Sequence, residues 1–561
     1  MGRGPAEVPA GPRRAGVMHV NSLWGELVAD ELAKAGVEAA VLAPGSRSTP
    51  LTVALAERDD VETFSHLDER SAAFFALGRA KRTGRPTPLV CTSGTAAANF
   101  HPAVVEADAA RVPMVLLTAD RPPELRDSGA NQTVDQEKLY GDAVRSYRTL
   151  PEPEPAARKL RSLRTAVSRA IGTATGAHSG PVHLNVPLRK PLEPNADPEA
   201  APAGVPAVTV SEAFLEANPL AATGREGPFV EVTRGRSRLA RGDRERLVEA
   251  IEAADGGLVV CGPTDRPAPA GDSLADLAAA TGFPVLADPL SGHRFGPLAE
   301  AGPVCGGYDA YLPALETTPD VVVRFGASPT SKPLRRYLRD AGARQFLVDP
   351  AGGWREATFA ATDLVVADET RLAAALAGAV DRERGAFGRR LLEAEAAYWE
   401  LVDGEEPEEG AVLADVIALA PDPATVVVSN SMPVRDLDRF GRPRAANLAV
   451  LGNRGASGID GVTSTALGAG SAVAEPLVAV VGDLAQYHDT EWFRTPHGLD
   501  FEPAAELHGL AFARTDDRER LRELFAESVG SEGAQVIEFI ADSGRNHDDR
   551  RALAERVVDS V

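Results

Sequence analysis

Lysine, cysteine and long apolar runs are all scarce in this chain of 561 residues, and each scarcity excludes a class of protein. The three cysteines, Cys91, Cys261 and Cys305, lie far apart, without the paired spacing of a disulfide framework or a cysteine zinc site. Such isolated thiols suit a reducing cytoplasm, which is the location we expect. No apolar run reaches the roughly 20 residues that a transmembrane helix needs, so we expect no membrane span.

Acidic residues greatly outnumber basic ones. Only six of the 59 basic residues are lysine, and 81 acidic residues bring the net charge to −22 at pH 7. An acidic, lysine-poor surface stays hydrated in concentrated salt, where screening confines electrostatic forces to a few ångström. We therefore interpret the chain as halophilic; a codon bias toward arginine would explain the missing lysine but not the excess acid. The lack of a basic stripe argues against a nucleic-acid partner.

Short apolar strands alternate with helices along the chain, a pattern that predicts α/β domains with doubly wound parallel sheets. The length exceeds what one core usually holds, and we predict three domains. Their expected bounds are 18–190, 207–380 and 411–561, with a Pro/Ala/Glu-rich linker at 191–206 and a linker helix at 381–410. Residues 1–17 lack the apolar core of a signal peptide and are interpreted as a disordered extension, with a true start at Met18 as the alternative.

Twelve strands are expected, four in each domain. They are 38–42, 87–91, 113–118 and 181–187, then 257–261, 283–287, 320–325 and 344–348, and finally 425–428, 447–450, 476–481 and 534–540. We also expect a charged helix at 381–401.

Polar and basic residues follow several expected strands of the first domain. Residues 44–48 (PGSRS) and 92–95 (TSGT) each follow a strand, and Arg121 follows a third. Open α/β sheets bind their ligands at the carboxyl ends of strands, and an arginine such as Arg47 can hold a carboxylate through two hydrogen bonds. One such arginine could equally form a surface ion pair worth under ~1 kcal/mol. Several arginines without a basic surface favour an internal site for an anionic substrate.

The third domain has a phosphate-like loop and an isolated acid. Residues 452–461 (GNRGASGIDG) can offer backbone N–H groups to a phosphate, beside Arg454. The loop lacks the Lys-Ser/Thr of a P-loop and does not match the dinucleotide fingerprint. Asp483 follows the expected strand 476–481, a common position for a Mg²⁺ ligand, although such an acid more often caps the next helix. Glu69, in the segment 66–70 (HLDER), would similarly serve most often as a helix-dipole partner.

Taken together, these phrases resemble one family. They are 43–51 (APGSRSTPL), 68–70 (DER), 92–96 (TSGTA), 118–125 (TADRPPEL), 129–132 (GANQ) and 453–461 (NRGASGIDG). The chain resembles the 2-succinyl-5-enolpyruvyl-6-hydroxy-3-cyclohexene-1-carboxylate synthases, thiamine-diphosphate enzymes of menaquinone biosynthesis, from Met18 to near its C-terminus. Related thiamine enzymes such as acetohydroxyacid synthases share the architecture but not the arginine-rich phrases.

The resemblance implies pyrimidine-binding, central and diphosphate-binding domains, assembled as a homodimer or homotetramer with active sites between two chains. It implies thiamine diphosphate with Mg²⁺ or Mn²⁺ as cofactors. The implied reaction is a transfer in which 2-oxoglutarate is decarboxylated on the cofactor and the product adds to isochorismate. Glu69 matches the catalytic glutamate that hydrogen-bonds the aminopyrimidine ring.

The remaining roles are carried over motif by motif. The cofactor-binding residues would be Pro44, Gly45, Thr92, Ser93, Gly455, Ala456, Ser457, Asp483 and Leu484. Isochorismate would be bound by Ser46, Arg47, Arg121, Asn131 and Gln132. The succinyl carboxylate would be bound by Asn430, Ser431, Arg435 and Arg454, with Lys332 as a weaker match. Asp483 would be a metal ligand.

The second metal ligand of the family pattern is missing. In this enzyme class an Asn-Asn pair follows the Gly-Asp pair by roughly 25 to 30 residues, at the end of the next strand. Here no such pair follows Asp483, and no apolar run between Leu484 and His508 could form a central strand. We interpret this as a deletion of a few tens of residues between about Asp489 and Glu491. We expect poor cofactor binding by the chain as written, with a non-catalytic remnant of the fold as the alternative function.

Overall fold

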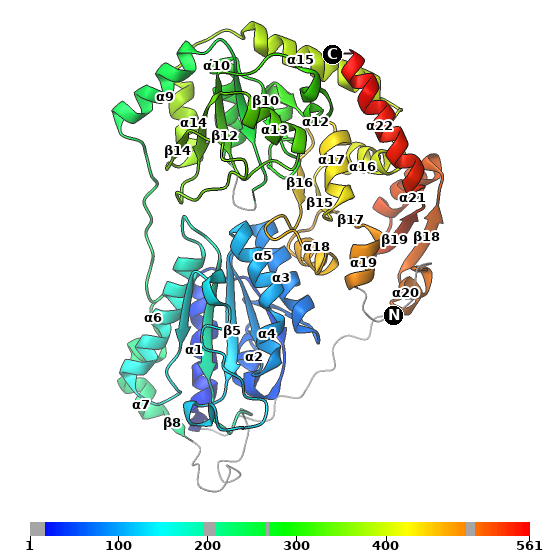
Figure 1. Cartoon of the computed structure of the whole chain (residues 1–561). Coiled ribbons are helices and arrows are strands. Elements are labelled where there is room, and N and C mark those ends of the chain that lie inside the picture. Colours follow the sequence, from blue (N-terminus) through cyan, green and yellow to red (C-terminus); the bar gives the residue numbers. More distant parts are fainter. Residues whose placement is uncertain (1–16, 195–207, 265–268, 490–499, 561) are drawn as a thin grey trace. The chain divides into compact units, whose positions relative to one another are not determined.

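A computed structural model describes residues 17–194, 208–264, 269–489 and 500–560 (Figure 1). The chain forms two compact units, Met1–Arg234 and Gly235–Val561. Among the described helices, none combines the length and the apolar character needed to cross a bilayer.

The first unit is built on a six-stranded sheet in the order β3-β2-β4-β5-β7-β6, and every neighbouring pair is parallel. The inner strands are buried along their whole length, which explains their uninterrupted apolar sequences. The strands are β2 (Ala39–Ala43), β3 (Glu62–Ser65), β4 (Thr87–Cys91), β5 (Met114–Asp120), β6 (Ser146–Thr149) and β7 (Pro181–Pro187). A separate antiparallel pair joins β1 (Val17–His19) to β8 (Thr209–Ser211).

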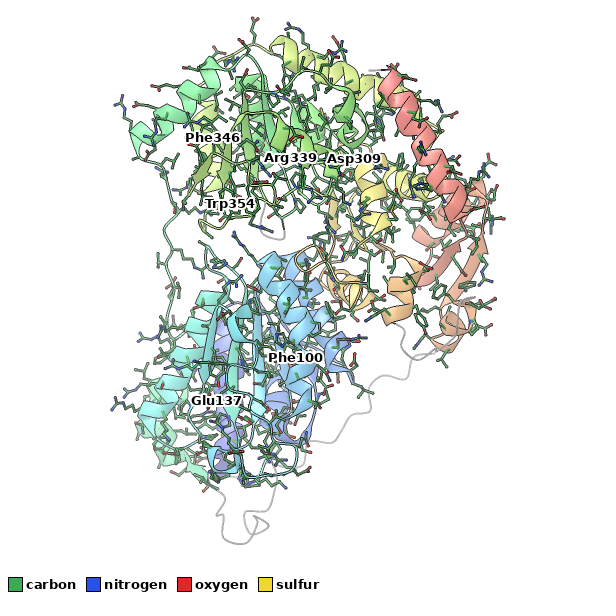
Figure 2. The ribbon with its side chains drawn as sticks, in the orientation of Figure 1. Phe100, Glu137, Asp309, Arg339, Phe346 and Trp354 are labelled. Carbon is green, nitrogen blue, oxygen red and sulfur yellow. The ribbon has the colours of Figure 1, made fainter. Side chains whose placement is uncertain are left out.

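Helices cover both faces of this sheet. One core contains Trp24 of α1 (Val20–Lys34) together with residues of α2 (Thr49–Ala56) and α6 (Ala157–Ala174). The other core lies under α3 (Glu69–Thr83) and α5 (His101–Ala110) and includes the fully buried Phe100 (Figure 2). The short helix α4 (Thr95–Asn99) follows β4. This two-sided covering is the doubly wound arrangement that the alternating pattern predicts.

The second unit begins with another parallel sheet of six strands, in the order β11-β10-β9-β12-β13-β14. Its strands are β9 (Gly257–Cys261), β10 (Val285–Ala287), β11 (Val304–Cys305), β12 (Val321–Phe325), β13 (Arg344–Val348) and β14 (Asp363–Val365). One core lies under α9 (Arg241–Ala253), α10 (Gly271–Thr281) and α14 (Glu369–Ala377). The opposite core lies under α12 (Tyr308–Tyr311), α13 (Lys332–Asp340) and α15 (Ala386–Val402).

The C-terminal part of the second unit has two smaller parallel sheets. The first has the order β16-β15-β17 and is formed by β15 (Ala424–Val428), β16 (Leu448–Leu451) and β17 (Leu477–Val480). The second pairs β18 (Ala511–Thr515) with β19 (Gln535–Phe539). Its helices are α16 (Glu408–Leu419), α17 (Met432–Phe440), α18 (Val462–Gly470), α19 (Asp483–Asp489), α20 (Glu502–Leu507), α21 (Arg518–Val529) and α22 (Ser543–Ser560).

Strand β17 is an edge strand with half-buried or exposed side chains, whereas its neighbour β15 is fully buried. Between β17 and β18 the described residues form α19 and α20 but no strand. The expected deletion point after Asp489 lies outside the described residues.

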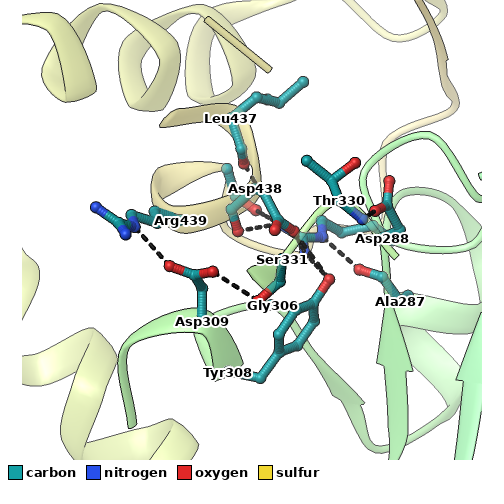
Figure 3. A network of polar contacts seen from close by, with 12 residues as sticks. Ala287, Asp288, Gly306, Tyr308, Asp309, Thr330, Ser331, Leu437, Asp438 and Arg439 are labelled. Carbon is teal, nitrogen blue, oxygen red and sulfur yellow. Dashed lines mark hydrogen bonds and ion pairs between the residues drawn. The ribbon is translucent and has the colours of Figure 1, made fainter. Parts of the chain in front are cut away.

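A buried polar network joins the central sheet to α17 (Figure 3). The guanidinium of Arg294, which is fully buried, donates to the Asp438 carboxylate at 2.7 Å and to the Tyr308 hydroxyl at 2.8 Å. Asp309 accepts from Arg439 at 2.6 Å and from Ser331 at 2.6 Å. A buried ion pair is tolerated only when further hydrogen bonds satisfy its groups, as they do here. The network contacts the start of α13, where the predicted substrate-binding residue Lys332 lies, and the last turn of α17.

All twelve expected strands are present, each within two residues of its expected ends. The expected helix at 381–401 begins later, at Ala386. The reason is tertiary, because the Arg382 side chain binds the carbonyl oxygens of Ile251 and Ala254 and holds the preceding residues outside the helix. Seven strands were not expected, because each has at most five residues and none forms a fully buried apolar run: β1, β3, β6, β8, β11, β14 and β18.

Candidate active site

The carboxyl ends of β2 and β4 are packed tightly against each other in the first unit. A side chain at Gly45 would bring its Cβ within 2.6 Å of the Thr92 Cβ, so only glycine fits there. The Arg47 N–H donates to the Thr92 hydroxyl at 3.2 Å. Ser48 closes the turn by accepting from the Gly45 N–H at 3.2 Å and donating to the Gly45 carbonyl at 3.0 Å. The predicted residues Gly45, Arg47 and Thr92 therefore lie together, with Pro44 and Ser46 exposed beside them.

Two arginines at this edge of the sheet are only partly satisfied. The Arg47 side chain is buried and donates to the Leu188 carbonyl at 2.6 Å, while Arg121 donates to the Asn131 carbonyl at 2.8 Å. The Nε of each arginine is buried and has no hydrogen-bond partner in the described part of the chain. Burial, followed by the charge of Arg121, lowers the pKa of Arg47 to about 10, while Asp120 opposes this change. Two neighbouring cations with unused donors form a site suited to a carboxylate.

Ser93 and Gln132 are joined by two hydrogen bonds. The Ser93 hydroxyl donates to the Gln132 carbonyl at 3.0 Å, and the Gln132 side-chain amide donates to the Ser93 carbonyl at 3.0 Å. Gln132 has a φ of 53°, an uncommon conformation for a residue other than glycine, and its side chain is exposed like that of Asn131. The loop that follows β5 is therefore attached to the loop that follows β4.

Glu69 is the first residue of α3 and is half-buried. Asp68 caps the helix by accepting from the Ser71 N–H at 2.8 Å, which leaves the Glu69 carboxylate for another role. The pKa of the Cys91 thiol is raised well above its usual value, first by burial and then by the negative charge of Glu69. Glu69 therefore lies near the carboxyl end of β4, at the same edge of the sheet as Thr92.

In the second unit, Asn430 ties the loop 452–461 to the end of β15. Its side-chain amide, which is buried, donates to the carbonyls of Asn453 at 2.8 Å and Gly458 at 2.7 Å, and its oxygen accepts from Arg454 at 3.1 Å. Ser457 has a φ of 63°, so the loop makes a tight turn there. The predicted diphosphate residues Gly455, Ala456 and Ser457 are half-buried or exposed on this turn.

The other predicted carboxylate-binding residues of this unit lie near helix starts. Ser431, with a φ of 72°, precedes α17, and the exposed Arg435 lies in the first turn of that helix. The structure brings Arg454 to Asn430, which is next to Ser431 in the chain. Lys332 is exposed at the first position of α13, after the buried Ser331.

The residues expected to bind the metal ion follow β17. The Gly482 N–H donates to the Ser429 hydroxyl at 3.1 Å, and Asp483 begins α19 with an exposed side chain, followed by Leu484, which is also exposed. No group of three or more His, Cys, Asp or Glu residues suited to a metal ion occurs in the part of the chain that the structure describes. Asp483 stays a prediction as a metal ligand.

Sequence reasoning missed several residues that support these loops. The Asp489 carboxylate accepts from the N–H groups of Gly461 at 2.6 Å and Thr463 at 2.8 Å, so it caps α18. Nothing in its local sequence marks this role. Two other missed residues, His183 and Asn185, are polar positions in the otherwise apolar strand β7, and that interruption is a signal that the sequence contains. Burial lowers the pKa of His183 to about 3, so its ring is neutral, and the ring contacts the Thr118 hydroxyl at 2.7 Å.

Comparison with known proteins identifies the family. Residues 24–139 match the family described as thiamine pyrophosphate enzyme, N-terminal TPP binding domain. A 2-succinyl-5-enolpyruvyl-6-hydroxy-3-cyclohexene-1-carboxylate synthase from Natronomonas pharaonis is 67% identical over 97% of this chain and 99% of its own length. The chain belongs to this family of synthases. Relatives of the same name are 56% identical in Haloarcula marismortui, over 97% of this chain and 99% of the relative, and 41% identical in a Roseiflexus species, over 95% and 97%.

Membership confirms the expected family, its α/β fold and thiamine diphosphate as its cofactor. The two archaeal relatives come from halophilic organisms, which agrees with the halophilic composition expected from the sequence. The alignment with the Natronomonas synthase spans 581 positions, more than the 561 residues of this chain, so that relative carries residues without a counterpart here.

Proposed function

We propose that this protein decarboxylates 2-oxoglutarate with thiamine diphosphate and adds the succinyl carbanion equivalent to isochorismate, giving 2-succinyl-5-enolpyruvyl-6-hydroxy-3-cyclohexene-1-carboxylate. The observation that carries this proposal is the pair Arg47 and Arg121, each with a buried, unpartnered Nε, at the sheet edge that also holds Glu69. Relatives named for this synthase, matched over nearly their full length, support the same reaction.

Isochorismate carries carboxylates, and the arginine pair supplies donors for them. In the proposed complex, Arg47 and Arg121 each use Nε and a terminal nitrogen to bind a carboxylate, which removes the repulsion between the two cations. Ser46, Asn131 and Gln132 are exposed beside the pair and hold the remaining polar groups of the substrate. Charged hydrogen bonds of this kind contribute roughly 1.5 to 3 kcal/mol each.

The bound cofactor supplies the electron sink that stabilises the carbanion. Glu69 holds the proton of a hydrogen bond to the aminopyrimidine ring, and its half-buried position strengthens that bond. The fit of these residues to the pyrimidine end of the cofactor is supported by Gly45, where any Cβ would fill the space beside Thr92. Pro44, Thr92 and Ser93 complete the pyrimidine side.

In this proposal the diphosphate end is held by Gly455, Ala456 and Ser457 with Leu484, on the turn that Asn430 stabilises. The succinyl carboxylate is bound by Ser431, Arg435 and Arg454, with Lys332 as a further cation. Asp483 would bind Mg²⁺ or Mn²⁺ through its exposed carboxylate, since hard cations prefer oxygen ligands.

We further propose that the enzyme is a cytoplasmic homodimer or homotetramer whose active sites lie between two chains. The cytoplasmic location is supported by three cysteines that are all buried and unpaired as disulfides. The oligomer is supported by the family resemblance. Size-exclusion chromatography with light scattering in concentrated salt measures the assembly.

The reaction itself is tested with purified protein, thiamine diphosphate, Mg²⁺, 2-oxoglutarate and isochorismate in concentrated salt. We expect the absorbance of isochorismate to fall only when 2-oxoglutarate and the cofactor are both present. Consumption of pyruvate in place of 2-oxoglutarate would replace this proposal by another thiamine reaction. Binding of isochorismate without any turnover is the result expected of a non-catalytic remnant.

A further inference from the structure

Gln136 is a buried glutamine that connects the carboxyl ends of two strands of the first unit, β4 and β5, to the interior of a third, β7. Its side chain is 1% exposed, and its amide oxygen accepts from the Gly94 N–H at 3.0 Å. Its amide nitrogen donates to the Ala119 carbonyl at 3.3 Å and to the Asn185 side-chain oxygen at 3.0 Å. One side chain therefore contacts the loop after β4, the end of β5 and the interior of β7.

The hydrogen-bonded chain continues from Gln136 to Arg121. The Asn185 side-chain nitrogen donates to one carboxylate oxygen of Asp120 at 2.8 Å. The other Asp120 oxygen accepts from the backbone N–H of Arg121 at 2.7 Å. Asn185 and Asp120 are almost fully buried, so water does not compete with these bonds. A continuous path of side chains thus runs from Gly94 through Gln136 to the backbone of Arg121.

The opposite end of this path, at Gly94, contacts the residues Ser93 and Gln132 of the predicted site. Gly94 has a φ of 92° and follows Ser93, which exchanges two hydrogen bonds with Gln132. A Cβ at Gly94 would lie 3.1 Å from the Gln132 side chain, so this backbone position determines where Gln132 can lie. Gln136 accepts a hydrogen bond from the Gly94 N–H and therefore sets the positions of Gly94 and Gln132.

We propose that Gln136 is a positioning residue for isochorismate, which fixes the spacing between Arg121 and the Ser93–Gln132 pair without touching the substrate. This inference rests on the proposed function, because it assigns the ligand that those residues bind. A loop end without such a hydrogen-bonded connection can shift by about 1 Å. A shift of that size can lower the reaction rate on the order of 10²-fold when a substrate must be held in one geometry. Gln136 supplies this tie through bonds that a leucine of similar size cannot make.

The test compares variants of the full chain by calorimetric titration with isochorismate in concentrated salt. We expect Gln136→Leu to raise the Kd for isochorismate at least about tenfold. Glu137 is the matched control, because it is the next residue but is exposed and pairs with Arg126 (Figure 2). Glu137→Ala should leave the Kd within about twofold of the wild-type value. Gln136→Glu keeps an acceptor for Gly94 but loses the donor to Asn185, so we expect a Kd between those of the wild type and Gln136→Leu.

A double-mutant cycle distinguishes positioning from general destabilisation. If Gln136 acts through Arg121, then Gln136→Leu should have little further effect on the Kd once Arg121→Ala is present. Hydrogen exchange gives a second readout, with faster exchange expected for the peptide that contains residues 92–95 in Gln136→Leu and not in Glu137→Ala. Gln136→Glu supplies both readouts if Gln136→Leu does not fold.

Three outcomes would count against these assignments, and they are distinguishable. Independent, multiplicative effects of Gln136→Leu and Arg121→Ala on the Kd would refute positioning through Arg121. An unchanged Kd in a folded Gln136→Leu or Gln136→Glu protein, with unchanged exchange at residues 92–95, would refute any positioning role. A wild-type chain that binds no isochorismate would overturn the proposed function instead, while faster exchange at residues 92–95 would still support the structural tie.

Discussion

Single residues of the candidate site carry costs that folding alone does not explain. Arg47 is buried beside another cation, and its Nε has no partner in the described part of the chain. An unsatisfied buried donor costs about 1 to 3 kcal/mol, more when the group is charged. A bound anion recovers that cost, which is why we assign Arg47 and Arg121 to substrate binding rather than to stability.

The first prediction concerns Arg47. Arg47→Ala should raise the apparent KM for isochorismate by roughly 10- to 100-fold with little change in kcat, because a lost charged hydrogen bond removes about 1.5 to 3 kcal/mol of uniform binding. Steady-state kinetics with each substrate varied in turn measures this effect. Arg339→Ala is the control, since Arg339 is exposed and forms an ion pair with its neighbour Asp340. An effect confined to 2-oxoglutarate would show that the two substrate subsites have been exchanged.

The second prediction concerns Glu69. Glu69→Gln keeps the size of the side chain but removes its exchangeable carboxyl proton, so turnover should fall by about 10²-fold or more. Thermal unfolding should change little, because the residue is half-buried at a helix start that Asp68 already caps. Turnover is measured in a variant that carries the Natronomonas segment inserted after Asp489. An unchanged rate in that protein would remove Glu69 from the mechanism.

The third prediction concerns His183 and acid stability. Because burial lowers its folded-state pKa to about 3, the unfolded chain binds a proton at this site below its ordinary pKa near 6.5 while the folded chain does not. This residue therefore reduces stability as the pH falls from about 6.5 toward 3, by up to about 1.4 kcal/mol per pH unit. Above pH 7 it has no such effect. Melting temperatures measured between pH 5 and pH 8 should fall less steeply toward acid pH in His183→Gln than in the wild type; equal slopes would contradict the assignment.

At the scale of elements, the C-terminal sheets are the unusual part of the fold. β15 is buried between two neighbours, but β17 is an edge strand, and β18 and β19 form a separate pair. An open parallel edge leaves backbone groups unpaired and side chains half exposed, which weakens that part of the protein. The alignment with the Natronomonas synthase contains positions without a counterpart in this chain, which agrees with our interpretation of a deletion.

The fourth prediction follows from this interpretation. Inserting the corresponding segment of the Natronomonas synthase after Asp489 should restore tight binding of thiamine diphosphate and Mg²⁺ and raise turnover, because under the deletion hypothesis this segment would supply the strand and the second metal ligand of the family pattern. Calorimetric titration with the cofactor and a melting curve measure the two effects. A Gly/Ser segment of equal length is the control and should restore neither. Equal affinity and turnover with and without the native segment would contradict the deletion hypothesis.

At the scale of the whole molecule, charge dominates. The net charge of −22 produces repulsion that destabilises the compact state unless salt screens it. Ion pairs between arginine and acidic residues oppose this repulsion locally. Arg518 in α21 binds Asp415 at 2.8 Å and Glu406 at 3.0 Å, which attaches α21 to α16. Screening weakens such pairs as well, but the large excess of acid makes relief of repulsion the greater effect.

The fifth prediction is that the melting temperature rises as KCl increases from about 0.1 M to about 2 M, where the Debye length falls below about 3 Å. Charge-changing variants of α9 test the cause. Replacing the exposed Glu249 and Glu252 with glutamine should reduce the salt dependence, whereas Arg244→Gln should increase it. The same salt dependence in both variants would attribute the effect to hydration rather than to net charge.

The sequence by itself determined the fold class, twelve of the strands and the family. These follow from local information: an apolar run long enough for a buried strand, a turn residue at its end, and short phrases such as residues 44–48 and 453–461. Contributions from distant residues were not predictable in this way. The helix expected at 381 begins at Ala386 because Arg382 binds carbonyls more than a hundred residues away in the sequence.

Only the tertiary structure decided which predicted residues meet and what supports them. It brought Arg47 to Thr92 and Arg454 to Asn430, and it revealed Gln136, Asn185 and Asp489 as the residues that hold the loops. Apart from the polar interruption of β7 at Asn185, these roles have no local signature, because a buried hydrogen bond depends on which strand ends the sheet order makes adjacent. The sequence specifies which chemical groups are present, and the order of strands determines which of them act together.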